Sequence, residues 1–145
     1  MNEQDRELLF IDLCGRIPYK VRMFEIEPIN DIQSNLTLQS ITNKESVICI
    51  TPSGGVIGSS IDAFKPYLFP LSSMTEEQRE EFLNIQTEER QILLNALIEY
   101  KSGKYDKIPI IAPYKQIEWL NKNHFDYRGL IERGLAIDAT NLNIY

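Results

Sequence analysis

The chain has 145 residues, of which 43 % are hydrophobic and 25 % charged, and its 21 acidic and 15 basic residues give a net charge of −6. This balance predicts one folded domain over residues 1–145 and argues against wholesale disorder, and the negative charge argues against binding to nucleic acid or anionic lipid. The apolar runs are too short to cross a membrane and the acidic N-terminus does not resemble a secretory signal, so we expect a cytoplasmic protein.

The first predicted elements are a helix and a bent strand. Residues 2–14 carry apolar side chains at helical spacing, and Gly15 is placed to end that helix. Residues 19–26 alternate as in a strand, and a change of phase after Met23 predicts a bulge or a sharp bend there.

Two further strands and a turn are predicted next. Residues 36–42 change phase between Leu38 and Ile41, and residues 46–51 form a continuous apolar run. A turn at residues 43–45 would join them as antiparallel neighbours. Cys14 and Cys49 have apolar neighbours, which is typical of reduced thiols in a core.

The β-rich part then closes with a glycine turn, a weak strand and one helical turn capped by Ser59 or Ser60. Pro66 and Pro70 should keep the last strand at a sheet edge. The sequence therefore predicts an α+β fold with a small bent antiparallel sheet or SH3-like barrel over about residues 17–72.

The second half, over residues 75–134, is predicted to be helical. Thr75 and Gln78 match a capping box, and neither Pro nor Gly follows before Gly103. Residues 86–91 contain no apolar side chain, so the helix either breaks near Thr87 or has a solvated middle. One long helix and two helices in series both remain open.

Two more helices and a strand are predicted near the C-terminus. Pro113 suits the first position of a helix that runs to about Asn123, and Asp126 can cap a final short helix that Gly134 ends. Residues 135–139 have the pattern of a strand that could return to the sheet.

The only histidine of the chain lies in this region, and it has two interpretations. His124 falls at a helix end, where its ring can interact with the last carbonyl groups. As a catalytic residue it would be a general base oriented by Asp126. We favour the structural role, because two residues spaced in this way point in different directions on a strand and match poorly on a helix.

A metal site or a cofactor is not predicted. A single histidine excludes two- and three-histidine sites within one chain, which leaves carboxylates. The densest carboxylate cluster is Glu76, Glu77, Glu80 and Glu81. These residues occupy the start of a predicted helix, where negative charge suits the dipole. "TPSGG" and "GGVIGSS" match neither a nucleophile elbow nor a phosphate-binding loop.

Exposed residues for binding can also be suggested. Tyr127 and Arg128 are residue types enriched at binding hot spots. From Thr75 to Glu99 seven acidic residues stand against two basic ones, so the acidic cluster of Glu76, Glu77, Glu80 and Glu81 belongs to a helix that could bind a basic partner. A solvated amphipathic helix has the same pattern, and we favour it.

Two stretches carry a resemblance: "KPYLFPLSSMTEEQREEF" and "EWLNKNHFDYRGLIERGLAID". They resemble a group of small uncharacterised proteins of gut-bacterial genomes, often found among phage or mobile-element genes, with K-P-Y-L-x-P-x-S-S-M-T-E-E and H-x-D-Y-R-G-L-I motifs. Phe69 stands where the resemblance leads us to expect arginine. The resemblance implies a bacterial, phage-associated setting and transfers no catalytic residue.

Three functions follow as hypotheses. The preferred one is a non-catalytic module that binds another protein through the barrel rim and the acidic helix. The second is an enzyme of unrecognised class with His124 and Asp126 in a cleft. The third is an acidic inhibitor that imitates DNA with the carboxylates of residues 76–99.

Overall fold

The computed structural model describes residues 1–26, 35–43, 45–104 and 114–145. The chain forms two compact units, one of Met1–Ser73 with Asn121–Tyr145 and the other of Met74–Leu120. We call the first the sheet unit and the second the helical unit, and each is described by itself. The single domain over residues 1–145 stays a prediction.

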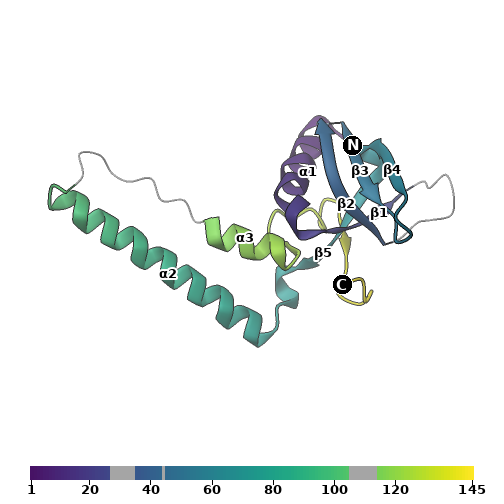
Figure 1. Cartoon of the computed structure of the whole chain (residues 1–145). Helices are drawn as coiled ribbons and strands as arrows, with labels where there is room; N and C mark the ends of the chain where they lie inside the picture. Colours follow the sequence, from purple (N-terminus) through teal and green to yellow (C-terminus); the bar gives the residue numbers. More distant parts are fainter. Residues whose placement is uncertain (27–34, 44, 105–113) are drawn as a thin grey trace. The chain divides into compact units, whose positions relative to one another are not determined.

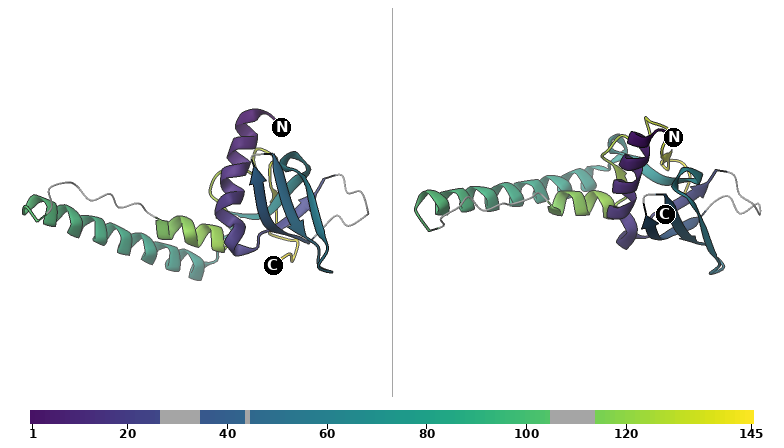
Figure 2. Two further views of the ribbon diagram at one scale, coloured as in Figure 1. Left: turned by 45° about the horizontal axis from the view of Figure 1, so that its top comes forward. Right: turned by 90° about the horizontal axis from the view of Figure 1, so that it is seen from above.

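The sheet unit combines one long helix, short strands and three turns of 3₁₀ helix. In chain order its elements are α1 (Glu3–Arg16), η1 (Ile17–Tyr19), β1 (Arg22–Glu25), β2 (Leu36–Asn43), β3 (Ser46–Ile50), β4 (Val56–Ser60), η2 (Ile61–Ala63), β5 (Phe64–Pro70), η3 (Leu71–Ser73), β6 (Phe125–Asp126) and β7 (Ile137–Asp138). Helix α1 lies alongside the strands (Figures 1 and 2).

The strands form one open, bent sheet in the order β4-β3-β2-β1-β5-β6, and β7 also pairs with β5. Neighbours from β4 to β5 are antiparallel, whereas β6 and β7 run parallel to β5. The predicted α+β class is confirmed. No pairing within the described residues closes the sheet from β4 to β6, so it is not a closed barrel, and the SH3-like assignment stays a prediction.

Helix α1 begins at a cap and continues further than its sequence suggests. The Asn2 side chain accepts a hydrogen bond of 2.8 Å from the backbone N–H of Asp5, which satisfies one of the free donors of the first turn. The prediction that Gly15 ends the helix is wrong, because the helix runs to Arg16. A Cβ on Gly15 would lie 2.9 Å from Nδ2 of Asn121, so the glycine permits a close approach.

The predicted bulge near Met23 is also wrong. Burial alternates without a break through Val21, Met23 and Glu25, while Phe24 stays half-buried. The sequence misleads here because a carboxylate, Glu25, occupies an inward position where an apolar residue is expected.

The phase change in the second predicted strand is confirmed. The pairing of β2 with β3 shifts register between Leu38 and Ser40, which turns the strand as a bulge does. The turn expected at residues 43–45 contains residue 44, which lies outside the described residues. Around it, the Asn43 side chain accepts hydrogen bonds of 2.9 Å from the backbone N–H groups of Glu45 and Ser46.

The predicted helical turn after β4 is confirmed, since the Ser60 side chain caps η2 by accepting the N–H of Asp62. The edge position of the following strand is wrong, because β5 pairs with β1 and also with β6 and β7. The prolines fit inside the sheet because Pro66 is the end of the register with β1 and Pro70 is the last residue of β5.

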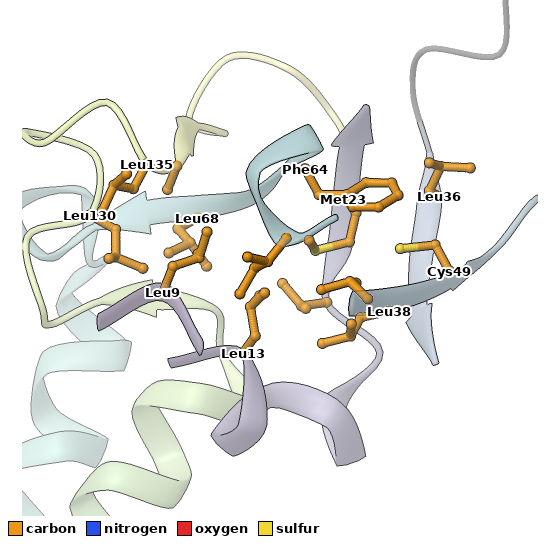
Figure 3. Packing of buried hydrophobic residues seen from close by; sticks show 14 residues of the cluster. Leu9, Leu13, Met23, Leu36, Leu38, Cys49, Phe64, Leu68, Leu130 and Leu135 are labelled. Carbon is orange, nitrogen blue, oxygen red and sulfur yellow. The ribbon is translucent and has the colours of Figure 1, made fainter. Parts of the chain in front are cut away.

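The core of the sheet unit lies between α1 and the strands (Figure 3). Leu9 and Leu13 of α1, Met23 of β1 and Phe64 of β5 are fully buried in one cluster. Leu130 joins the same cluster from the C-terminal segment. Full burial of a side chain of this size contributes roughly 1.5–3 kcal/mol, so the C-terminal segment is part of the fold and not an appendage.

The two cysteines differ in environment. Cys49 is buried in the core, and burial together with the nearby Glu25 carboxylate raises the pKa of its thiol to about 12. Cys14 is exposed, so the prediction of a core thiol is wrong there. Leu13 takes the inward position of α1, and the next residue is turned by about 100° around the helix axis.

The helical unit contains α2 (Glu76–Lys101) and the start of α3 (Tyr114–Lys122). The capping box is confirmed, because the N–H of Thr75 donates to Gln78 Oε1 at 2.9 Å and the N–H of Gln78 donates to Thr75 Oγ1 at 3.3 Å. The question of one helix or two is settled in favour of one. Pro113, the predicted first residue of α3, lies outside the described residues.

The predicted solvated middle of α2 is confirmed for Thr87, Glu88, Arg90 and Gln91, which are exposed, whereas Glu89 is buried against α3. Phe82 packs on Trp119 with ring centroids 5.4 Å apart. Glu89 accepts hydrogen bonds from the backbone N–H of Lys115 at 2.8 Å and from Gln116 Nε2 at 2.6 Å. None of the helices in the described ranges is both long and apolar enough to cross a bilayer.

The final short helix predicted between Asp126 and Gly134 is not formed. The segment consists of hydrogen-bonded turns, in which the N–H groups of Leu135 and Ala136 both donate to the carbonyl of Leu130. The strand predicted over residues 135–139 is confirmed in a shorter form as β7, which returns to pair with β5.

Candidate functional site

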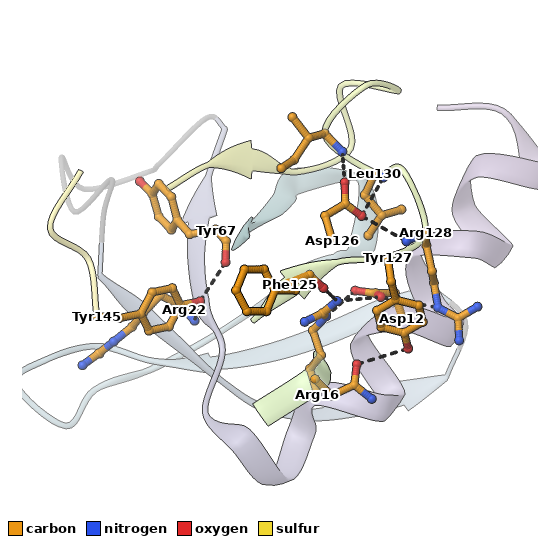
Figure 4. A network of polar contacts seen from close by, with 12 residues as sticks. Asp12, Arg16, Arg22, Tyr67, Phe125, Asp126, Tyr127, Arg128, Leu130 and Tyr145 are labelled. Carbon is orange, nitrogen blue, oxygen red and sulfur yellow. Dashed lines mark hydrogen bonds and ion pairs between the residues drawn. The ribbon is translucent and has the colours of Figure 1, made fainter. Parts of the chain in front are cut away.

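Residues 123–134, which follow α3, form a compact segment that we call the polar loop, and Asp126 organises it. Oδ1 of Asp126 accepts the N–H groups of Arg128 at 3.3 Å and Leu130 at 2.9 Å, and Oδ2 accepts the N–H of Ile131 at 2.8 Å (Figure 4). The side chain is buried. Asp126 is therefore a cap, as its sequence predicts, but it caps a set of turns in place of a helix.

His124 lies two residues after the end of α3, in the left-handed backbone region, with φ of 59°. Its ring stacks on that of Tyr145, with centroids 4.0 Å apart and an angle of 14° between the planes. Nδ1 is buried and has no hydrogen-bond partner. Burial, followed by the charges of Arg16 and Arg22, lowers the pKa of His124 to about 4.

Tyr145 fixes the other side of this stack. Its hydroxyl donates to the carbonyl of Tyr67 at 2.7 Å and accepts the backbone N–H of Arg22 at 3.1 Å (Figure 4). Burial of the hydroxyl raises the pKa of Tyr145. The stack therefore ties the C-terminal residue to β1 and β5.

The structure gives His124 and Asp126 separate roles. Both oxygens of Asp126 accept backbone N–H groups, and the buried nitrogen of His124 receives no partner. A catalytic base needs a group that orients it and a proton within reach. The geometry favours a neutral aromatic ring that packs against Tyr145, and the acid–base pair stays a prediction.

Tyr127 and Arg128, predicted as exposed binding residues, are half-buried. The Arg128 guanidinium lies over the Tyr127 ring at 4.9 Å, and its Nε is 3.5 Å from Oδ1 of Asp12. The Tyr127 hydroxyl donates to Asn121 Oδ1 at 3.2 Å. Both side chains are thus engaged with the sheet unit.

Arg128 connects to a fully buried ion pair in α1 that was not predicted from the sequence. Arg16 donates from Nε to Asp12 Oδ2 at 2.6 Å and from Nη2 to Asp12 Oδ1 at 3.1 Å, and both side chains are 0 % exposed. Nη2 of Arg16 also donates to the carbonyl of Phe125 at 2.8 Å. The pair ties α1 to the polar loop. Its signal in the sequence is acid–base spacing of four residues beside Leu9 and Leu13, but such spacing is also common on solvated faces.

The protonation of His124 gives a testable pH dependence. In the unfolded chain His124 binds a proton below about pH 6.5, whereas in the folded chain it does so only below about 4. The contribution of the neutral His124 ring to the free energy of unfolding is therefore fully present above pH 6.5 and is lost as the pH falls from 6.5 towards 4. Allowing for solvent screening of a half-buried ring, we expect this contribution to be about 2 kcal/mol.

His124→Asn isolates the contribution of the ring, because asparagine tolerates left-handed backbone and does not titrate. Urea unfolding at about pH 7.5 and about pH 4.5 should show the wild-type advantage over the variant shrinking by about 2 kcal/mol at the lower pH. An advantage of the same size at both pH values would contradict the neutral, buried ring.

The acidic cluster lies where its sequence predicts, in the first turns of α2. Glu76, Glu77, Glu80 and Glu81 are all exposed. No group of three His, Cys, Asp or Glu side chains in the described parts of the chain is arranged to hold a metal ion. The placement suits the helix dipole, whatever the carboxylates bind.

Helix α2 also carries a feature that the sequence analysis missed, on the side away from its contacts with α3. Leu83, Leu94 and Ile98 share this side by helical spacing and are 57 %, 53 % and 64 % exposed. We define the outer face of α2 as this set with the exposed residues on the same side from Glu80 to Lys101, so that its members are Glu80, Leu83, Thr87, Arg90, Gln91, Leu94, Ile98 and Lys101.

The signal for the outer face was present in the sequence. Ile92, Leu93, Ala96 and Leu97 make one apolar stripe of α2, and Leu94 and Ile98 are the apolar residues left over. A helix that is apolar on more than one side is usually covered on more than one side. Comparisons of the chain with models of protein families, with curated proteins and with solved structures find no match.

Proposed function

We propose that the protein is a non-catalytic module that binds another protein chain through the outer face of α2. The single observation that carries the proposal is the exposure of Leu83, Leu94 and Ile98, each more than half open to solvent. Single exposed apolar residues are ordinary, but several on one helical face mark interaction sites.

The contacts of α3 leave this face open. They reach α2 at Phe82, Gln86 and Glu89, on the other side of the helix. A helix that is packed on one side and carries exposed apolar side chains on another is suited to binding a further helix or groove. Apolar residues flanked by charge also match the usual anatomy of an interface, with a hydrophobic centre and a polar rim.

The sheet unit acts in this proposal as a folded support. We propose that its bent strands with η2 before the last long strand are of the SH3-like kind, and that the protein works in the cytoplasm of a bacterial cell in a phage or mobile-element setting. What supports a structural role for the polar loop is that Asp126, Tyr127 and Arg128 all make contacts within the sheet unit.

Site-specific photo-cross-linking tests the proposal. A benzophenone amino acid placed at position 94, in the full chain produced in its native host, should give a discrete adduct on irradiation. Asn84 provides the matched control, because it is exposed on the same helix and turned by about 100° from Leu83. We expect the yield at 94 to exceed that at 84 by at least about tenfold, since hot spots are confined to the centre of an interface. Equal yields, or no adduct from positions 83, 94 and 98, would refute a binding role for this face.

A further inference from the structure

The pattern of the outer face points to a particular occupant. Every member has a counterpart at the same distance from the midpoint between Arg90 and Gln91. The counterparts are Glu80 with Lys101, Leu83 with Ile98, Thr87 with Leu94, and Arg90 with Gln91. A two-fold axis through this midpoint would place each residue opposite its counterpart in a second, antiparallel helix.

We infer that two copies of the chain pair through the outer faces of α2, antiparallel and about a two-fold axis between Arg90 and Gln91. The inference rests on the proposed function and names its partner as a second copy. Leu83 of one copy lies against Ile98 of the other, on both sides of the axis. The pairing thereby removes the exposed Leu83 and Ile98 side chains of both copies from solvent.

Charge complementarity selects the antiparallel arrangement. Glu80 and Lys101 are both exposed and stand at opposite ends of the outer face. In an antiparallel pair each Glu80 meets the Lys101 of the other copy, whereas a parallel pair would set Glu80 against Glu80 and Lys101 against Lys101. Like charges that face one another are destabilising, so the parallel arrangement, which has such contacts at both ends, is disfavoured. The two Arg90 side chains lie near one another beside the axis in either arrangement and do not select between them.

The centre of the face can be covered without leaving a buried hydroxyl unsatisfied. The hydroxyl of Thr87 already donates to the carbonyl of Leu83 at 2.9 Å, and Gln91 already donates from Nε2 to Asn95 Oδ1 at 2.9 Å. Burying these residues against Leu94 and Arg90 of the other copy therefore costs less than burying free polar groups. One helical face per copy is a small interface, which predicts a dissociation constant of roughly micromolar size.

Sedimentation equilibrium of the purified full chain tests the pairing. Between about 1 and about 300 µM the mass should rise from the 16.8 kDa of one chain towards that of two chains. Leu94→Glu should weaken pairing at least about tenfold, and Asn84→Glu, the matched control at an exposed position turned by about 100° from Leu83, should change it by less than about twofold. A circular-dichroism melt of each variant confirms that it is folded. A wild-type chain that stays monomeric over the whole range, or equal effects of the two variants, would overturn the inference.

A charge exchange tests the register. Glu80→Lys and Lys101→Glu should each weaken pairing by about five- to tenfold, because each creates two like-charge contacts in the dimer. The double variant should pair within about twofold of the wild type. Failure of the double variant to recover would overturn the antiparallel pairing. A monomeric chain that still gives the cross-linked adduct at position 94 with a different protein would remove the self-pairing and leave the proposed function standing.

Discussion

Replacing Arg16 by methionine is expected to lower the free energy of unfolding of the sheet unit by about 3–5 kcal/mol, because the Asp12 carboxylate then stays buried with only the more distant Arg128, whose Nε is 3.5 Å away, beside it. Both side chains are 0 % exposed and share two hydrogen bonds. The Arg16 contact with the carbonyl of Phe125 is lost as well. Hydrogen exchange of the amides of β5, read against urea concentration, reports on this unit.

The double variant Asp12→Leu with Arg16→Met is the control for this prediction. Replacing a buried ion pair by apolar residues of similar size is often nearly neutral, so most of the lost stability should return. If the double variant is as unstable as Arg16→Met alone, the loss comes from the packing of the arginine stem and not from an unpaired charge. Recovery of stability in the double variant should be incomplete, because Arg128, whose Nε is 3.5 Å from Asp12, loses its carboxylate neighbour as well.

Replacing Asp126 by alanine is expected to lower the free energy of unfolding by about 3 kcal/mol, because three backbone N–H groups lose a charged acceptor. Two of these groups, on Leu130 and Ile131, donate at 2.9 and 2.8 Å and belong to the turn that brings Leu130 into the core. Urea unfolding followed by far-ultraviolet circular dichroism measures the loss.

The chain supplies a matched control at Asp138. Its Oδ1 also caps a turn, accepting the N–H and the hydroxyl of Thr140 at 2.9 and 2.6 Å, but the residue is exposed. Asp138→Ala should cost about 1 kcal/mol or less, since water replaces the lost acceptor. Equal losses at the two aspartates would mean that burial of the polar loop adds nothing to the cap.

The sequence predicts those features of the fold whose causes are local. The capping box at Thr75 and Gln78, the cap at Ser60 and the bulge after Leu38 each depend on residues only a few positions apart. Asp126 belongs to the same class, because its acceptors serve N–H groups two to five residues later.

Features that depend on distant partners were not predicted. The Asp12 and Arg16 pair reads as an ordinary surface pair until the carbonyl of Phe125, 109 residues from Arg16, is placed beside it. Gly15 reads as a helix terminator for the same reason, because only the approach of Asn121 explains its place inside α1. Glu25 reads as a solvent-facing residue although it is buried.

The binding site proposed from the structure differs from the one predicted from the sequence, and the reason is again that burial depends on distant contacts. Tyr127, Arg128 and His124 draw attention because their residue types are common at sites, but all three make contacts within the sheet unit. The outer face of α2 was not predicted as a site, because in the sequence Leu94 and Ile98 are typical of additional core residues, and only the structure shows that they are exposed.

The yield of the cross-linked adduct from position 98 tests the central claim most directly when it is compared between Leu94→Glu and His124→Asn chains at about pH 7. We expect at least about a tenfold loss of adduct with Leu94→Glu and a change of less than about twofold with His124→Asn, since the ring packs inside the sheet unit. Loss of the adduct with His124→Asn, together with an unchanged yield with Leu94→Glu, would contradict it and return the function to the polar loop.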